Sequence, residues 1–190
     1  MSRPELGTAL LLIARQAIGE EFGDGIRSAV PASLLELPEL HLPGASFVTL
    51  RLAGELRGCI GTLEAQRPLL DDVRHNARAA AFLDTRFKPL SAAEFPKINI
   101  EVSLLDTPVP LHCASEAEAL ALLRPMVDGV ILRCGGRRAT FLPQVWEDLP
   151  DPKQFMAQLK RKAGLAIDGW NDDIQLSRYE VRKWKEAPDQ

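Results

Sequence analysis

Apolar residues recur at helical spacing in three stretches of the chain, which predicts amphipathic helices with one buried face. These stretches are Leu6–Phe22, Leu69–Ala81 and Phe155–Ala163. Capping residues add a fourth helix from Ser115 to about Leu123 and start the last helix at Asp151-Pro152. The run Gly23-Asp24-Gly25 is expected to end the first helix.

Elsewhere the apolar residues alternate or lie between turn signals, which predicts β-strands. The expected strands are Phe47–Leu52, Leu56–Ile60, Ile98–Leu105, Val130–Arg133, Arg138–Leu142 and an irregular last strand, Gln175–Trp184. Tight turns at Ala53–Glu55 and Gly135-Gly136 join four of them into two hairpins. Pro31–Gly44 is expected to be mostly loop with one helical turn, and Pro108 and Pro110 are expected to break the chain.

Hairpins separated by helices indicate an α+β fold with largely antiparallel sheets flanked by helices. A chain of 190 residues suits a single domain with two lobes, here residues 1–190 with a core of about 6–184.

Composition narrows the class of protein. Hydrophobic residues make up 46% and charged residues 26%, and the net charge of −3 gives no overall basic field for nucleic acid. The three cysteines form no CxxC pair, so we expect no disulfide framework and a reducing, cytoplasmic setting. No signal peptide is recognised, and the apolar run Ala9–Ala14 is too short to span a membrane.

The most informative stretch is Leu56–Thr62, which sets a cysteine between two glycines and two residues after an arginine. Alternation along a strand places Arg57, Cys59 and Gly61 on one face and Leu56, Gly58 and Ile60 on the other. A guanidinium favours the thiolate form of a neighbouring thiol, and glycines in a strand permit close approach of a ligand or of another backbone. Cys59 is therefore a nucleophile or redox thiol, a small packing residue, or part of a surface shaped for a substrate or partner.

Glu101 lies on the polar face of the strand Ile98–Leu105 together with Asn99 and Ser103. Such a face is ordinarily solvated. If it instead lines a cleft with Cys59, Glu101 is a candidate general base or a partner of Arg57.

Four further polar residues are candidates for substrate contact. Asp84 and Arg86 form either a local ion pair or part of a binding site, and Thr140 and Gln144 follow the second hairpin. The scattered histidines show no metal-ligand spacing, and no phosphate-binding glycine motif is present, so no metal or cofactor is predicted.

The C-terminal part is locally basic, although nearby acidic residues offset much of that charge. Its basic residues are Lys160, Arg161, Lys162, Arg178, Arg182, Lys183 and Lys185. A solvated face is one interpretation and contact with RNA or a nucleotide phosphate is the other.

Several blocks resemble, in order, the signature of the AMME chromosomal-region protein family. They are Leu56–Thr62, Asp84–Leu90, Asn99–Ser103, Asp128–Leu132, Ala139–Glu147 and Lys162–Leu165, with Trp170 and Tyr179. The resemblance implies a two-lobed α+β domain and, in prokaryotes, association with a Memo-type protein and a radical-SAM protein in the AmmeMemoRadiSam system.

Together these observations predict a cleft around Cys59 that acts on or holds a small anionic, nucleotide-like substrate. Cys59 and Glu101 are the catalytic candidates. The substrate-binding candidates are Arg57, Gly58, Gly61, Thr62, Asp84, Arg86, Thr140 and Gln144. The alternatives are a non-catalytic module that docks a Memo-type or radical-SAM partner, and an RNA-contacting domain.

Overall fold

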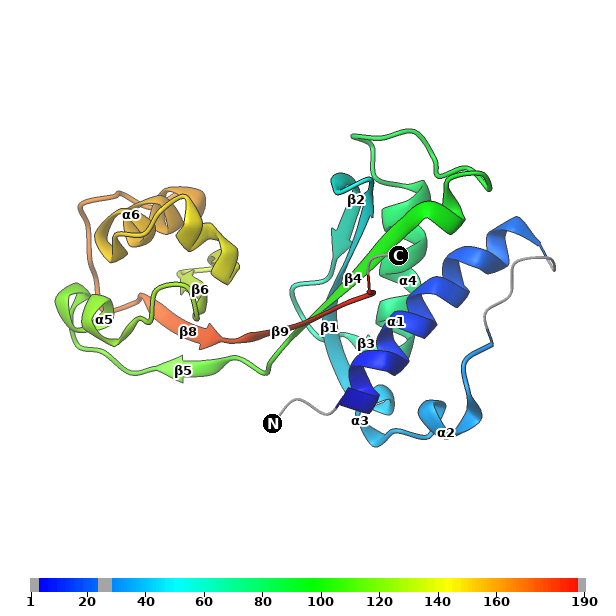
Figure 1. Cartoon of the computed structure of the whole chain (residues 1–190). Coiled ribbons are helices and arrows are strands. Elements are labelled where there is room, and N and C mark those ends of the chain that lie inside the picture. Colours follow the sequence, from blue (N-terminus) through cyan, green and yellow to red (C-terminus); the bar gives the residue numbers. More distant parts are fainter. Residues whose placement is uncertain (1–3, 24–28, 188–190) are drawn as a thin grey trace. The chain divides into compact units, whose positions relative to one another are not determined.

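The computed structural model describes residues 4–23 and 29–187, which fold into two compact units (Figure 1). The first unit holds residues up to Leu105 and from Arg182 onward, and the second runs from Asp106 to Val181. Each unit has its own antiparallel sheet, its own helices and its own core. The structure therefore confirms the α+β class and the flanked antiparallel sheets.

The first unit is built on a sheet with the strand order β2-β1-β4-β9, and β3 pairs with the start of β1. Its strands are β1 (Pro43–Leu52), β2 (Glu55–Gly61), β3 (Arg67–Pro68), β4 (Ile98–Leu105) and β9 (Val181–Lys185). Its helices are α1 (Pro4–Gly19), η1 (Glu20–Phe22), α2 (Ala32–Leu35), α3 (Pro38–His41), α4 (Leu69–Phe82) and η3 (Phe95–Lys97). Asp24 and Gly25, expected at the end of the first helix, lie outside the described residues.

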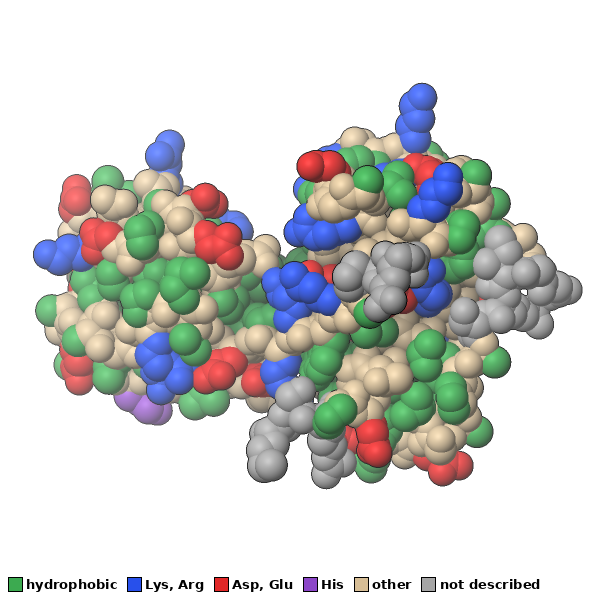
Figure 2. All heavy atoms as spheres, viewed as in Figure 1, with side chains coloured by type: hydrophobic (Ala, Val, Ile, Leu, Met, Phe, Trp, Pro, Cys, Tyr) green, Lys and Arg blue, Asp and Glu red, His purple; other side chains and the backbone are tan. Residues whose placement is uncertain are grey.

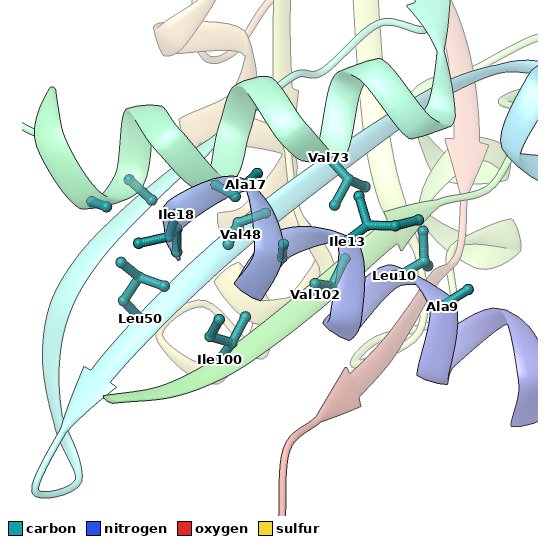
Figure 3. Packing of buried hydrophobic residues seen from close by; sticks show 14 of the residues in the cluster. Ala9, Leu10, Ile13, Ala17, Ile18, Val48, Leu50, Val73, Ile100 and Val102 are labelled. Carbon is teal, nitrogen blue, oxygen red and sulfur yellow. The ribbon is translucent and has the colours of Figure 1, made fainter. Parts of the chain in front are cut away.

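Helices α1 and α4 cover one face of this sheet (Figure 3). Ile13 and Val73 of the helices meet Val48 of β1 and Val102 of β4, and all four side chains are fully buried. The apolar stripes of the helices and the alternation of β4 predicted this core. Because side chains alternate along a strand, Thr49 and Glu101 point to the other face, which we call the outer face.

The second unit contains a four-stranded sheet with the order β5-β8-β6-β7. Its elements are β5 (Val109–Leu111), α5 (Glu116–Leu122), β6 (Gly129–Cys134), β7 (Arg137–Phe141), η4 (Pro143–Glu147), α6 (Pro152–Lys162) and β8 (Gln175–Tyr179). Its core centres on Trp146, whose indole stacks on the ring of Phe155 with centroids 3.7 Å apart. Ser115 and Asp151 cap α5 and α6 as the sequence predicted.

Two local predictions about strands were wrong. The predicted last strand, Gln175–Trp184, is two strands that join different sheets, β8 in the second and β9 in the first. Val109–Leu111, expected to break the chain, forms β5 at the edge of the second sheet, where proline is tolerated.

The prediction that Leu56 lies on the same face as Gly58 was also wrong, because β2 contains a bulge. Leu50 pairs with Gly58 but Arg51 pairs with Leu56, so Arg57 is an extra residue in the ladder. Leu56 therefore shares the outer face with Cys59 instead of facing the helices with Gly58.

None of the helices within residues 4–23 and 29–187 is long and apolar enough to cross a membrane.

Candidate functional site

Cys59 lies on β2, the edge strand of the first sheet, and points to the outer face. It pairs across the sheet with Thr49 of β1, which in turn pairs with Glu101 of β4. The sulfur of Cys59 lies 3.2 Å from the hydroxyl oxygen of Thr49 and is partly exposed. The thiol is thus one end of a polar row that crosses three strands, and it is not sealed in the apolar core.

The other end of this row is a carboxylate held by two lysines. Glu101 exposes only 8% of its side chain, and the Nζ atoms of Lys183 and Lys185 each lie 3.1 Å from one of its oxygens. Burial is the largest single effect on Glu101 and opposes its ionisation, but the hydrogen bonds and the charges of Lys185 and Lys183 together outweigh it and lower the pKa of that carboxyl. Basic side chains gather over β9 in Figure 2.

Arg57 does not pair with Glu101, which was one of the alternatives. Its Nε donates to Glu94 at 2.9 Å and its Nη2 donates to the same carboxylate at 3.2 Å. The hydrogen bonds from Arg57 and from Ser91 lower the pKa of Glu94 from 4.5 to about 2. The charge expected to stabilise a Cys59 thiolate is therefore compensated by a carboxylate.

Asp84 and Arg86 hold the main chain of Cys59, and we call this pair the Cys59 latch. The N–H of Cys59 donates to Asp84 Oδ2 at 2.9 Å, and Arg86 Nη2 donates to the carbonyl of Cys59 at 3.3 Å. The two side chains also form the expected ion pair, 2.8 Å long. The hydrogen bond from Arg86 lowers the pKa of Asp84 well below its usual range. The latch satisfies edge-strand groups that would otherwise be open to another chain.

The two glycines of the motif are approached closely by the chain itself. A Cβ on Gly58 would lie 2.1 Å from the backbone oxygen of Ala80 in α4. A Cβ on Gly61 would lie 2.1 Å from the ring of Phe47. Packing of the protein against itself therefore explains why both positions carry glycine. Ligand contact at either glycine stays a prediction.

Thr62 anchors the end of β2 to a buried polar cluster. Its hydroxyl donates to Asp72 Oδ1 at 2.8 Å, and Asp72 is fully buried in α4. The N–H and hydroxyl of Ser46 donate to the other oxygen of Asp72, each at 2.8 Å. Asn76 donates to the same oxygen at 3.0 Å. Sequence reasoning missed this cluster because nothing in the pattern of α4 shows which polar residue faces inward.

The remaining candidates, Thr140 and Gln144, belong to the second unit. Thr140 is buried, donates to the carbonyl of Val130 at 3.0 Å and lies 3.1 Å from the hydroxyl of Tyr179. Gln144 is exposed on η4. The structure thus gathers eight of the ten candidate residues in the first unit, all around β2 or in its cross-strand row. The described residues contain no group of three His, Cys, Asp or Glu side chains arranged to hold a metal ion.

Lys183 and Lys185 are site residues that the sequence interpretation did not connect to Cys59. A signal was present, because two lysines spaced two residues apart in a strand share a face. What the sequence did not show is that β9 pairs with β4 and therefore lies beside Glu101.

The chain is similar to known proteins over most of its length. The AMMECR1 family matches residues 11–184 of the chain. A protein from Methanothermobacter thermautotrophicus is 36% identical over 189 residues, covering 98% of this chain and 96% of its own length. A protein from Aeropyrum pernix is 37% identical over 187 residues, covering 95% of this chain and 79% of its own length.

The fold is also similar to that of a solved structure. The crystal structure of uncharacterized protein PH0010 from Pyrococcus horikoshii matches with a TM-score of 0.77 at 30% identity. The match covers 97% of this chain and 93% of the other. With a family match over most of its length and relatives of this similarity, the chain belongs to the AMMECR1 family.

Proposed function

We propose that this protein holds a small anionic, nucleotide-like molecule on the outer face of the first sheet, where Cys59 contacts it. The observation that carries the proposal is the polar row of Cys59, Thr49 and Glu101, flanked by Lys183 and Lys185. Two ammonium groups face one carboxylate there, which leaves one positive charge at the β4–β9 end of the row, two strands or about 10 Å from Cys59. Lys185 exposes 61% of its side chain, so its remaining donors are accessible to a ligand.

The chemistry favours binding over catalysis by Glu101. A general base works best with a pKa near the working pH, and the lysines move the pKa of Glu101 in the opposite direction. Glu101 is better suited to orienting the two lysines. Cys59 would then supply a polarisable contact at the edge of the site.

Paired alkylating reagents test this proposal, since iodoacetate is anionic and iodoacetamide is neutral. We expect the ratio of the iodoacetate rate to the iodoacetamide rate at Cys59 to exceed the ratio for the free thiol of N-acetylcysteinamide by about twofold in low-salt buffer, the attraction of one charge about 10 Å away in water. K185Q should remove most of that excess, because Lys183 alone then only balances Glu101. K97Q, which removes an exposed lysine of the same unit, is the matched control and should retain it. Equal ratios at Cys59 and N-acetylcysteinamide would overturn the proposal.

A second candidate is a non-catalytic docking module, and one observation favours it. The Cys59 latch and the packing of Gly58 and Gly61 give the motif residues structural tasks that need no ligand. In this version the strand shapes a surface for a Memo-type or radical-SAM partner, as the family resemblance implies. C59S separates the two candidates. Because serine is nearly isosteric with cysteine, docking of a partner should be preserved, whereas binding of an anionic molecule that contacts the Cys59 sulfur should weaken.

A further inference from the structure

Strand β9 forms one edge of the first sheet, and the Cys59 strand β2 forms the opposite edge. The residues of β9 from Arg182 onward belong to the first unit. An edge strand carries a row of backbone N–H and C=O groups that no neighbouring strand uses, and such a row can pair with another chain. The properties of this edge do not depend on the chemistry of Cys59.

The other three edges of the two sheets each carry a feature that hinders pairing with another chain. On β2, the Cys59 latch binds the main chain of the edge. On β7, the Nζ of Lys162 donates to the carbonyl of Thr140 at 3.0 Å. On β5, Pro110 has no N–H group to donate.

Two hydrogen bonds show which main-chain groups of β9 face its neighbour β4. The N–H of Glu186 donates to the carbonyl of Ile100 at 2.9 Å, and the N–H of Asp106 donates to the carbonyl of Glu180 at 2.9 Å. These two pairs are separated by the same number of residues on both strands, so the ladder between them contains no bulge. The even-numbered residues of this segment therefore turn their N–H and C=O groups toward β4.

The odd-numbered residues Lys183 and Lys185 turn their N–H and C=O groups to the open side of β9, because the direction alternates along an antiparallel strand. No side chain in the described part of the chain bonds to the main chain of either lysine. These two residues thus present a ready template for one further strand.

The side chains of Lys183 and Lys185 lie on the outer face and share one carboxylate. Each Nζ lies 3.1 Å from an oxygen of Glu101, and the two lysine side chains are 41% and 61% exposed. A strand added beside β9 places its own side chains directly opposite the lysines, with Cβ atoms about 5 Å apart. Acidic side chains at these positions continue a row that alternates in charge from Glu101 outward.

The residue between the two lysines points to the helix side of the sheet. Trp184 packs on α1, where a Cβ on Gly7 would lie 2.1 Å from the indole. The indole stays partly exposed, and the guanidinium carbon of Arg182 lies 5.8 Å from its ring centre. On this side an added strand therefore meets a partly apolar surface, which suits β-branched side chains.

The end of β9 is fastened to the first unit, so this edge is in place before any partner binds. Arg15 of α1 donates to both carboxylate oxygens of Glu186, at 2.6 and 2.5 Å. The same carboxylate accepts a hydrogen bond from the N–H of Ile100 at 2.7 Å. An edge held in this way loses little conformational freedom on binding, which favours association.

We propose that the free edge of β9 binds an extended acidic segment of another protein, which adds one antiparallel strand to the first sheet. The main chain of the segment bonds to Lys183 and Lys185, and its acidic residues face these lysines while β-branched residues alternate with them. A second copy of this chain is a poorer occupant, because pairing β9 with itself sets lysines opposite lysines.

Amide hydrogen exchange of the whole chain, measured by NMR with the capped heptapeptide TVEVEVT, tests the proposal. We expect exchange at the N–H groups of Lys183 and Lys185 to slow by about tenfold when the peptide concentration is ten times its Kd. Exchange at the N–H groups of Arg182 and Trp184 should not change, because these groups already face β4.

Two altered peptides separate strand addition from simple attraction of charge. A peptide that is N-methylated at both glutamates keeps its charge but loses the N–H groups that face β9, so we expect it to bind at least about tenfold more weakly. The peptide TVKVKVT keeps the β-branched residues and reverses the charge, and we expect it not to protect Lys183 or Lys185.

Variants of the two lysines test the charge complementarity from the side of the protein. K183Q and K185Q should each weaken binding of TVEVEVT by about threefold, the loss of one cross-strand charge pair. Each variant keeps one lysine on Glu101, so this buried carboxylate stays paired. The matched control K88Q removes an exposed lysine of the loop after α4 and should bind the peptide like the wild type.

Four results would overturn the proposal. They are no protection by TVEVEVT at millimolar concentration, equal affinities of TVEVEVT and its N-methylated form, equal protection by TVKVKVT, and equal weakening by K88Q and K183Q. Protection in the free chain that grows with protein concentration would also overturn it, in favour of a second copy. Tighter binding of a single-stranded RNA oligonucleotide at this edge, with a steep salt dependence, would overturn it in favour of a nucleic-acid surface.

Discussion

The strand around Cys59 and the tip of the β6–β7 hairpin differ in how closely the rest of the protein packs against them. Around Cys59, the latch of Asp84 and Arg86 binds the main chain, and the backbone of Ala80 fills the space beside Gly58. At the hairpin tip, a Cβ on Gly135 or Gly136 would meet no atom within 4 Å, so the glycines border open space. The first region is the more recognisable in sequence, whereas the second has the more open geometry.

A recognisable sequence motif can therefore reflect a packing requirement of the fold as well as a catalytic role. Changes in the Cys59 strand should therefore act first on stability, and changes of the exposed side chains at the hairpin tip should have little effect on stability. Three predictions for the first unit test that division, beginning with the largest effect.

The substitution G58A should destabilise the protein most. The added Cβ would lie 2.1 Å from the backbone oxygen of Ala80, and a backbone atom in a helix has little freedom to move. We expect the free energy of unfolding to fall by about 3 kcal/mol, the upper range for overpacking. Urea denaturation followed by circular dichroism measures the change.

The matched control is G169A in the second unit. A Cβ at Gly169 would meet Ala166 at 3.6 Å, an ordinary van der Waals contact. We expect a change of less than about 1 kcal/mol there. If G58A were as stable as G169A, helix α4 would be able to move away from the added Cβ. Packing would then not explain why position 58 carries glycine.

Removal of the Cys59 latch should have the next largest effect. D84A leaves the N–H of Cys59 without its acceptor and Arg86 without its ion-pair partner, so we expect a loss of about 2 kcal/mol. R86A should cost less, because Arg86 exposes 55% of its side chain. T85A changes an exposed neighbour and serves as the control. A double-mutant cycle of D84A and R86A by chemical denaturation measures their coupling, and additive losses would show that the two residues act separately.

Sequence periodicity predicted the fold wherever burial repeats regularly. The stripe of α1 and the alternation of β4 made the first core predictable from side-chain chemistry alone. The bulge at Arg57 and the division of residues 175–184 between two sheets were not predictable. Each depends on which strand lies alongside, and a local pattern does not contain that information.

For the candidate site, the sequence indicated the residues but not their partners. Arg57 and Asp84 are substrate-contact candidates from the sequence, and the structure places Arg57 on the cysteine strand and Asp84 beside it. Their partners, Glu94 and the main chain of Cys59, come from loop geometry that no spacing rule encodes. The same limit applies to Glu101, because its partners Lys183 and Lys185 are far from it in the sequence.

The smallest expected effect is a change in the pH dependence of stability. The pKa of Glu94 falls from 4.5 to about 2 on folding, so its ion pair with Arg57 stabilises the protein above pH 4.5 and is lost as the pH falls toward 2. E94Q should flatten the fall in unfolding free energy over this window by about 1 kcal/mol, a value reduced for solvent screening of a partly exposed pair. E55Q, at the exposed first residue of β2, is the control and should follow the wild type. Because the lowered pKa of Asp84 acts in the same direction, E94Q should retain part of the acid sensitivity, and D84N/E94Q should lose more of it. Urea titrations at pH 5 and pH 2.5 provide the comparison, and equal falls in the free energy of unfolding for the wild type and E94Q would show that the ion pair of Arg57 and Glu94 does not contribute to the acid sensitivity.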